Sequence, residues 1–384
     1  MLKKNNYFQS YSLSKKKYNT NVIKTKKAFK LLCADIVNFN IPLLSSYETD
    51  YNFDFSPETV KKFSKYENII LFGMGGSILG TKSIYSFLRE KIKKKIFFFD
   101  NLDIDLHNKF KNIKNIKNSC FIVVSKSGNT LETITNLNII LSKSLLKNKL
   151  VIITELKDNN LINIGSKFSA EIIEHKHFIG GRYSVLSEVG MFPAALMNLK
   201  INKFKNLKKL IHNRQFSSSL VNSVSAIYTL NELGVKNSVL LNYDSRANDL
   251  CLWYQQLVGE SLGKKSKGIT PIISSCPKDH HSLLQLYLDG PRDKFFTFFT
   301  FSKNKNKKIK KIVNAQCEAT KTIFKRKKIP YRHFVFKKNN ESELGSAFTF
   351  FVLETILLAH LMKVNPYDQP AVDQVKIETK NYLK

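Results

Sequence analysis

Short apolar runs alternate with longer stretches of helical periodicity along most of this chain. The runs are rich in Ile, Val and Phe and have the length of buried strands, whereas the stretches between them repeat apolar residues every three or four positions. The predicted strands are 68–72, 96–100, 120–124, 150–154, 238–242, 271–274, 295–301 and 331–336. The predicted helices are 78–90, 130–147, 247–262, 281–288 and 308–326. This order predicts βαβ units and parallel sheets.

The strands fall into two sets, which predicts an α/β protein of two doubly wound parallel-sheet domains with a helical C-terminal segment. We expect an N-terminal arm with helices over residues 1–60, a first domain over 61–200 and a second domain over 201–340. C-terminal helices over 341–384 are expected to complete the active site. In such domains, ligands bind at the carboxyl ends of the strands and in the crevice between domains.

Three segments outside the strand pattern need an interpretation of their own. Residues 1–27 are basic and lack the apolar core of a signal peptide, so we expect a surface arm. The polar, lysine-rich residues 202–219 are predicted to link the two halves. The most apolar segment, 347–362, contains Glu354 and His360 and is shorter than the about 20 residues that span a bilayer. It is predicted to be a buried helix rather than a membrane helix.

The charge of the chain raises a different possibility. The 384 residues include 62 Lys and Arg but only 30 Asp and Glu, a formal charge of +32 that could attract nucleic acid or an anionic membrane. Only seven of the basic residues are arginines, and lysine lacks the planar guanidinium that reads bases and phosphates. We therefore interpret the charge as a lysine-rich surface, and we expect neither a nucleic-acid nor a membrane partner.

The five cysteines lie far apart, without a C-x-x-C pair or a histidine at metal-ligand spacing. This pattern predicts neither disulfides nor a zinc site, and it is typical of a reducing compartment. We therefore expect a cytoplasmic protein that uses no metal and no cofactor.

A glycine-rich loop follows the first predicted strand, with the sequence Gly73-Met74-Gly75-Gly76-Ser77-Ile78-Leu79-Gly80. Its glycines permit a tight turn, and the N–H groups at the start of the next helix can bind an anion. It fits neither the Walker A pattern, which ends in Gly-Lys, nor the dinucleotide pattern, which needs glycine at Ile78. Taken alone, the loop is equally well explained as a turn that joins strand to helix.

A second loop follows the strand at 120–124, with the sequence Ser125-Lys126-Ser127-Gly128-Asn129-Thr130. Hydroxyls and N–H groups can surround a phosphate, and helix capping explains only one or two of these side chains. The loop closely resembles the signature of sugar-isomerase (SIS) domains, so both domains are expected to be SIS-type, and the resemblance implies a phosphosugar ligand. The residues of the two loops expected to bind it are Gly76, Ser77, Ser125, Lys126, Ser127 and Thr130.

Four further segments resemble motifs of the glucose-6-phosphate isomerase family, in the family's order. Residues 180–190 and 365–376 resemble its two signatures, and residues 255–264 and 279–285 resemble its base and histidine segments. The resemblance implies reversible conversion of glucose 6-phosphate to fructose 6-phosphate through ring opening and a cis-enediol, without metal or nucleotide.

Three places depart from the family pattern: Ser127, Ala371 and the Cys276-Pro277 pair. These departures leave the chemistry intact but put sugar selectivity in doubt. A bifunctional glucose/mannose 6-phosphate isomerase is therefore one alternative. A non-catalytic SIS module that senses phosphosugars is another, although it leaves the base and histidine segments unexplained.

Isomerisation of an aldose to a ketose needs a base, a group that opens the sugar ring, and positive charge near the enediolate. Glu260 is predicted to be the base, in the last turn of a helix that Gly263 ends. As an isolated residue it would be a solvated helix-end glutamate, and only its place in the family segment favours catalysis. Arg182 follows two glycines and is expected to bind the enediolate oxygens, and its alternative is a structural ion pair, for instance with Glu188.

The ring-opening residue implied by the resemblance is His281, at the start of a predicted helix, with His280 as the competing candidate. Imidazole is suited to proton exchange near neutral pH. In the family this histidine comes from the neighbouring subunit, which implies a homodimer with a shared active site.

Gln369 and Lys376 lie seven residues apart, which is two helical turns, so both can face the same ligand. Gln369 is expected to bind substrate and Lys376 to assist ring opening. The alternative is a solvated basic helix face that Lys376 shares with Lys380 and Lys384.

Overall fold

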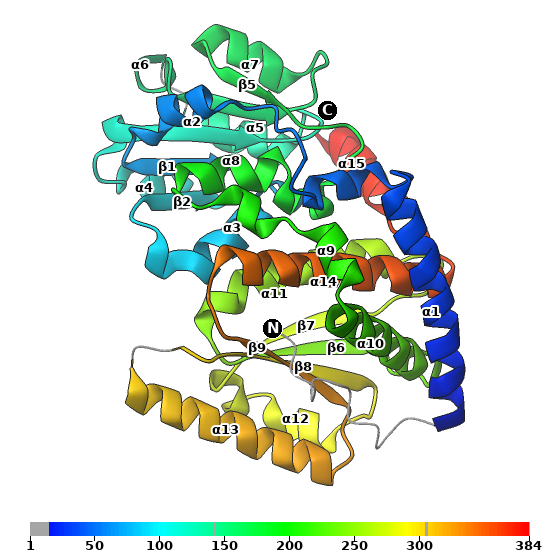
Figure 1. Ribbon diagram of the computed structural model, residues 1–384. Coiled ribbons are helices and arrows are strands. Elements are labelled where there is room, and N and C mark those ends of the chain that lie inside the picture. Colours follow the sequence, from blue (N-terminus) through cyan, green and yellow to red (C-terminus); the bar gives the residue numbers. More distant parts are fainter. Residues whose placement is uncertain (1–14, 141–142, 304–305, 384) are drawn as a thin grey trace.

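The computed structural model describes residues 15–140, 143–303 and 306–383, and it holds two β-sheets with helices between them and on their outer faces (Figure 1). The first sheet has the strand order β2-β1-β3-β4-β5, and the second has the order β7-β6-β8-β9. All paired strands of the two sheets are parallel. The predicted α/β fold with two doubly wound parallel sheets is confirmed.

The strands are β1 (Asn68–Phe72), β2 (Lys95–Phe99), β3 (Ser119–Val124), β4 (Leu150–Thr154), β5 (Glu171–Glu174), β6 (Asn237–Asn242), β7 (Thr270–Ser275), β8 (Lys294–Phe301) and β9 (Tyr331–Phe336). The α-helices are α1 (Lys15–Val37), α2 (Pro57–Ser64), α3 (Gly76–Leu88), α4 (Leu106–Lys111), α5 (Leu131–Ile140), α6 (Lys143–Leu146), α7 (Asn160–Phe168), α8 (Glu188–Leu196), α9 (Leu207–His212), α10 (Arg214–Glu232), α11 (Asn248–Leu262), α12 (Leu284–Asp289), α13 (Lys307–Arg326), α14 (Glu341–Met362) and α15 (Pro370–Tyr382). The 3₁₀ helices are η2 (Pro42–Tyr47), η3 (Arg89–Lys91), η4 (Ile116–Asn118), η5 (Gly181–Leu186), η6 (Ile201–Phe204), η7 (Ser245–Ala247) and η8 (Lys278–His281).

All eight predicted strands are present, and their ends differ from the prediction by at most one residue. The prediction missed β5, a four-residue edge strand with glutamates at both ends that lacks the long apolar run of the others. The stretch 130–147 is helical over Leu131–Ile140 (α5) and Lys143–Leu146 (α6), and residues 141–142 between them lie outside the described part of the chain. The helix predicted to begin at His281 begins instead at Leu284, because η8 precedes it.

The strand β1 shows why these apolar runs fold as central parallel strands. All five of its residues are buried, because helices cover both faces of the sheet. Ile69 and Leu71 belong to the large core between the two sheets, whereas Ile70 and Phe72 belong to a separate core on the outer face of the first sheet. Successive side chains of β1 therefore point into two different cores. A continuous run rich in Ile and Leu places apolar side chains on both faces of the strand, whereas an alternating pattern would place polar side chains on one of them.

The N-terminal segment is not a surface arm over its described part. Residues 15–37 form α1, which packs against α10 and α14. Its buried positions recur every three or four residues, at Asn21, Thr25, Ala28, Leu32 and Ile36. The prediction of an arm over 1–27 is wrong here because two of these positions are polar, so the buried face is hard to recognise in a lysine-rich run. Residues 1–14 lie outside the described part of the chain.

The stretch 202–219 is not an extended linker either. It holds the end of η6, all of α9 and the first turns of α10. Its apolar side chains are buried in the core between the sheets, among them Phe204, Leu207 and Ile211. A Cβ on Gly345 of α14 would lie 1.9 Å from the backbone oxygen of Phe204, so the two backbones are in direct contact. The segment joins the two sheets as part of the packed core.

The apolar segment near the C-terminus is the long helix α14, which lies between the two sheets (Figure 1). It is long and apolar enough to cross a membrane, but most of it is buried against other elements of the protein, as predicted. Its Glu354 forms an ion pair with Arg332 of β9, and both side chains are only 1% exposed. The charge that interrupts the apolar run is therefore paired inside the protein.

One buried lysine in the same region has an unusual environment. The Lys205 side chain is buried, and its amine lies 3.6 Å from the centre of the Phe53 ring and 4.4 Å from that of Tyr51. Among the described residues, its Nζ has no hydrogen-bond partner. Burial lowers the pKa of Lys205 to about 7, against the opposing attraction of Glu188 and Asp50.

We expect this lysine to make the stability of the protein rise between pH 7 and 9. The unfolded chain keeps the ordinary lysine pKa of about 10.4, so above pH 7 it binds a proton that the folded protein lacks. This difference raises the free energy of unfolding by at most about 1.4 kcal/mol per pH unit. In urea unfolding at both pH values, Lys205→Met should lose that rise, whereas Lys209→Met, at an exposed neighbour, should keep it. The same pH dependence in all three proteins would contradict this account.

Candidate active site

The order of the first sheet brings the two predicted phosphate loops together. The strand β1 lies between β2 and β3. The chain therefore goes from β1 to β2 on one side of it, and then crosses to β3 on its other side. The loops after β1 and β3 therefore lie side by side at the carboxyl edge of the sheet, which is where doubly wound folds bind ligands.

The first loop makes a close backbone contact with η5. Gly75 has φ +51°, and α3 begins at Gly76. A Cβ on Gly76 would lie 2.1 Å from the carbonyl carbon of Gly181, far inside van der Waals contact. The Ser184 hydroxyl donates to the Gly76 carbonyl at 3.3 Å. Only glycine at position 76 therefore lets this loop approach the segment that carries Arg182.

The second loop is closed on itself by its hydroxyls. The Ser125 and Thr130 hydroxyls are 2.7 Å apart, and the Asn129 N–H donates to the Ser127 hydroxyl at 3.2 Å. Gly128 has φ +68°, and a Cβ there would collide with Asn159. The sequence analysis did not single out Asn159, which also caps α7 by accepting from the Ile162 N–H.

Lys126 lies at the side of this loop. Its amine donates to the His177 carbonyl at 2.6 Å and lies 3.8 Å from the Glu155 carboxylate. Burial lowers the pKa of Lys126; Glu155 opposes the shift and Lys157 adds to it. The lysine charge is thus partly balanced by Glu155.

Arg182 joins three segments that are far apart in the sequence. Its guanidinium is 2% exposed and donates to Glu260 at 3.1 Å, to the Gln369 side-chain oxygen at 2.7 Å and to the Ser261 hydroxyl at 2.9 Å. It also donates to the carbonyls of Pro366 and Asp368. The structure therefore brings together the predicted residues Arg182, Glu260 and Gln369.

The alternative partner of Arg182, Glu188, is elsewhere. Its carboxylate accepts from the Tyr51 hydroxyl at 3.0 Å and from the Asp54 N–H at 3.2 Å. Burial raises the pKa of Glu188. The interpretation of Arg182 as a structural partner of Glu188 is wrong.

Glu260 lies in the last turn of α11, as predicted, and the helix ends at Gly263, whose N–H donates to the Gly259 carbonyl at 3.0 Å. Each of its carboxylate oxygens has a partner, because Arg182 binds Oε2 and Gln256 donates to Oε1 at 2.9 Å. The Glu260 side chain is still 33% exposed. The carboxylate is thus held in one orientation while a ligand can reach it, as a general base requires.

The C-terminal helix meets the site only at its beginning. Gln369 stands at the N-cap position of α15, and its side-chain oxygen accepts from Arg182 instead of from a backbone N–H of the helix. None of the residues Pro370–Tyr382, all of which the structure describes, is buried. Lys376 is 65% exposed and pairs with Asp373 of its own helix at 3.0 Å. Within this chain the structure brings Gln369 to Arg182, while the role of Lys376 stays a prediction.

The two neighbouring histidines have different environments. The His280 ring is half-buried, and its Nε2 is 2.8 Å from the Tyr243 hydroxyl. Burial lowers the pKa of His280, and the neighbouring His281 adds to the shift. His281 is exposed at the end of η8. His280 is therefore engaged inside its own subunit, whereas His281 is open to contact from outside.

Sequence reasoning missed three side chains that support the site. Gln256 stands four residues before Glu260, a helical spacing that could have indicated their contact. Tyr183 and Ser261 each follow a predicted site residue, and their hydroxyls are 2.9 Å apart. The Tyr183 hydroxyl also donates to the Pro366 carbonyl at 2.8 Å. Only the folded chain shows that these groups surround Arg182.

Two solved structures share most of this fold. A hypothetical protein from Thermus thermophilus has a TM-score of 0.80 at 20% identity, covering 95% of this chain and 96% of that chain. A glucose-6-phosphate isomerase from Chlamydia trachomatis has a TM-score of 0.70 at 20% identity, covering 85% of this chain and 71% of that chain. At these identities the likeness shows the fold alone, which this chain shares with both structures.

Sequence comparison identifies the family of this chain. Residues 55–275 match the family described as phosphoglucose isomerase. The glucose-6-phosphate isomerase of Methanocaldococcus jannaschii is 31% identical over 352 residues, covering 85% of this chain and 87% of that protein. The glucose-6-phosphate isomerase of Campylobacter jejuni is 28% identical over 347 residues, covering 83% of this chain and 85% of that protein. The chain belongs to the phosphoglucose isomerase family, which confirms the resemblance inferred from its motifs.

The close contact at Gly76 can be tested by a pair of glycine substitutions. Gly76→Ala should lower the free energy of unfolding by about 1–3 kcal/mol, because the added methyl group must push η5 away from the loop. Gly259→Ala is the control, since no described atom lies within 4 Å of its Cβ position. Alanine there should raise stability by about 0.5–1 kcal/mol, as expected inside a helix. Equal effects of the two variants in thermal unfolding would refute the contact.

Proposed function

We propose that this chain interconverts glucose 6-phosphate and fructose 6-phosphate, with Glu260 as the base. As a member of the phosphoglucose isomerase family it is an aldose–ketose isomerase. The observation that carries the proposed site is the contact of buried Arg182 with both Glu260 and Gln369, which joins three predicted segments at one point.

In the proposed mechanism, the two loops of the first sheet bind the phosphate. Ser77, Ser125, Ser127 and Thr130 supply the hydroxyls that contact it. Each hydroxyl can rotate its proton toward a phosphate oxygen. Lys126 adds positive charge beside the loop. The phosphate anchors the sugar so that its C1 and C2 reach Glu260.

Glu260 then moves the proton. Its carboxylate removes the hydrogen from C2 of the open-chain aldose as a proton, the electrons of that bond form the C1–C2 double bond, and the carbonyl electrons move to the C1 oxygen to give a cis-enediolate. The C1 oxygen takes up the proton of the C2 hydroxyl, so the intermediate passes through the cis-enediol level and the C2 oxygen becomes the new carbonyl oxygen. The same carboxylic acid returns the proton to C1, which leaves the ketose. Arg182, which already touches Glu260, stabilises the negative charge that develops on the oxygens at C1 and C2.

Ring opening is assigned to His281, which exchanges a proton between the ring oxygen and the C1 hydroxyl, with Lys376 assisting by its charge. His281 is exposed and Lys376 lies on an exposed helix. Both therefore suit an active site that two subunits complete together. We propose a cytoplasmic homodimer in which each subunit supplies His281 to the site of its partner.

Replacing the base tests the mechanism. Glu260→Gln keeps the shape of the side chain but cannot accept the proton, so kcat should fall by about 10²–10⁴-fold, the usual contribution of a general base. Uptake of tritium from water into the sugar should fall in parallel. A coupled assay with glucose 6-phosphate and, separately, mannose 6-phosphate measures turnover and also separates the bifunctional alternative.

The matched control for this substitution is Glu318→Gln, at an exposed position of α13. It makes the same chemical change away from the site and should leave turnover unchanged. Full activity of Glu260→Gln would eliminate Glu260 as the base. Sugar-phosphate binding without tritium uptake by the wild-type protein would instead favour the non-catalytic sensor.

The shared active site can be tested by mixing two inactive subunits. If His281 acts in the partner's site, a dimer of one Glu260→Gln and one His281→Ala subunit holds one site with both changes and one intact site. Joint refolding of equal amounts should therefore restore about one quarter of wild-type activity, because about half of the dimers are mixed. The same coupled assay measures the restored activity. If no activity returns, Glu260 and His281 act within one subunit.

A further inference from the structure

The two neighbouring histidines lie on η8, a short 3₁₀ helix that follows β7. It has only four residues, and the hydrogen bonds of a 3₁₀ helix have poorer geometry than those of an α-helix. The His281 side chain is exposed and makes no hydrogen bond within the described part of the chain. The position of His281 therefore depends on how the rest of η8 is held.

Asp279 fixes η8 to the strand that precedes it. Its carboxylate accepts from the Ser275 N–H at 2.7 Å and from the Ser274 hydroxyl at 3.1 Å, both at the end of β7. The Asp279 carbonyl accepts from the Leu283 N–H at 2.9 Å, where the chain enters α12. This residue thus ties η8 to β7, and the next residue supplies a second contact.

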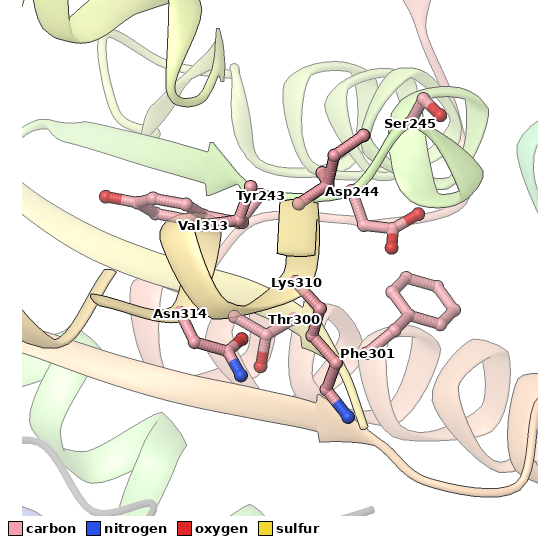
Figure 2. A pocket seen from close by; sticks show the side chains of 9 residues that line it. Tyr243, Asp244, Ser245, Thr300, Phe301, Lys310, Val313 and Asn314 are labelled. Carbon is pink, nitrogen blue, oxygen red and sulfur yellow. The ribbon is translucent and has the colours of Figure 1, made fainter. Parts of the chain in front are cut away.

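His280 holds η8 to the neighbouring strand through Tyr243, the residue after β6. The two rings lie edge to face with their centres 5.6 Å apart, and His280 Nε2 is 2.8 Å from the Tyr243 hydroxyl. Figure 2 shows the Tyr243 ring extending away from the side chain of Asp244. The Tyr243 ring is buried and stacks on Phe298 of β8, with 5.9 Å between the ring centres. His280 is therefore bound to a packed part of the core.

The hydrogen bonds around Tyr243 indicate which nitrogen of His280 carries a proton. The Thr320 hydroxyl of α13 donates to the Gln316 carbonyl at 2.8 Å and accepts from the Tyr243 hydroxyl at 3.2 Å. That bond uses the single proton of the tyrosine, so the tyrosine oxygen is left to accept from the Nε2–H of His280. His280 therefore serves as a hydrogen-bond donor here, a role that an amide N–H could also fill.

We propose that Tyr243 and His280 are positioning residues for His281, an inference that rests on the proposed role of His281 in ring opening. They tie η8 to β6 and α13, while Asp279 ties it to β7. His281 comes next in the chain, so its ring projects from a backbone that is held by two strands. Proton exchange needs the imidazole within reach of both sugar oxygens, and a displacement of about 1 Å can lower the rate about 10²-fold.

Two substitutions of His280 separate positioning from catalysis. His280→Gln keeps an N–H for Tyr243 but cannot exchange protons, so kcat with glucose 6-phosphate should stay within about threefold of wild type. His280→Leu removes the donor, so kcat should fall about 10–100-fold. Tyr243→Phe, which removes the acceptor, should act like His280→Leu. The control is His212→Leu, at an exposed position of α9, which should leave kcat unchanged.

Two results of this series would overturn the positioning role. Full activity of His280→Leu would mean that the contact with Tyr243 does not matter for turnover. An equal loss in His280→Gln and His280→Leu would mean that the imidazole of His280 itself exchanges the proton. Thermal unfolding confirms that each protein is folded.

Binding of an open-chain ligand distinguishes a displaced His281 from damage to the whole site. Arabinonate 5-phosphate has no ring to open, and its carboxylate has two oxygens like the enediolate. In calorimetric titration, His280→Leu should bind it within about threefold of the wild-type affinity, because groups that act only in ring opening do not contribute to this binding. Equal losses of affinity and of kcat would indicate a general structural effect and would overturn the positioning role.

Mixed dimers test whether His280 acts in the partner's site, as His281 is proposed to do. A dimer of one Glu260→Gln and one His280→Leu subunit should hold one site with both changes and one intact site. Joint refolding of equal amounts should therefore restore about one quarter of wild-type activity, as for the His281→Ala mixture.

The two mixtures also separate this inference from the proposed function. If the His281→Ala mixture regains activity and the His280→Leu mixture does not, the positioning role is overturned while the proposed function stands. If neither mixture regains activity, the shared active site is wrong, and the inference fails with it.

Discussion

The buried guanidinium of Arg182 is the constraint on which the active site depends. A charge taken out of water is costly unless charged or polar groups surround it. Here the compensation comes from α11, through Glu260 and Ser261, and from the segment before α15, through Gln369 and the carbonyls of Pro366 and Asp368. Displacing any of these groups leaves part of the charge unpaired. The positions of Glu260 and of the C-terminal segment are therefore set by the same buried charge.

The framework could be predicted from the sequence because its strands are buried on both faces. Such strands read as continuous runs of Ile, Val and Phe, and the loops that follow them carry recognisable glycines and hydroxyls. The elements that the prediction missed bury polar side chains as well as apolar ones. In α1, Asn21 is buried because it donates to Thr229 and Glu232 of α10, and Lys205 is buried between aromatic rings. Polar residues that find such partners cannot be distinguished from surface residues by their pattern alone.

The site shows a similar division. The motifs identified Arg182, Glu260 and Gln369, and the fold joins them. Motifs do not show whether two residues act within one chain, and His281 is exposed on this chain, so its place in a partner's site stays a prediction. Supporting contacts such as that between Tyr183 and Ser261 depend on the meeting of distant segments, so they follow from the fold and not from local sequence.

The helix α14 has a consequence for how the chain is made. It is apolar enough to pass for a membrane segment, yet it packs against α1, α3, α10 and α11, all of which precede it in the sequence. During synthesis these partners have already left the ribosome when α14 emerges, because domains form from the N-terminal side first. This long apolar helix is therefore translated after the helices that cover it, so they can bury it almost as soon as it appears.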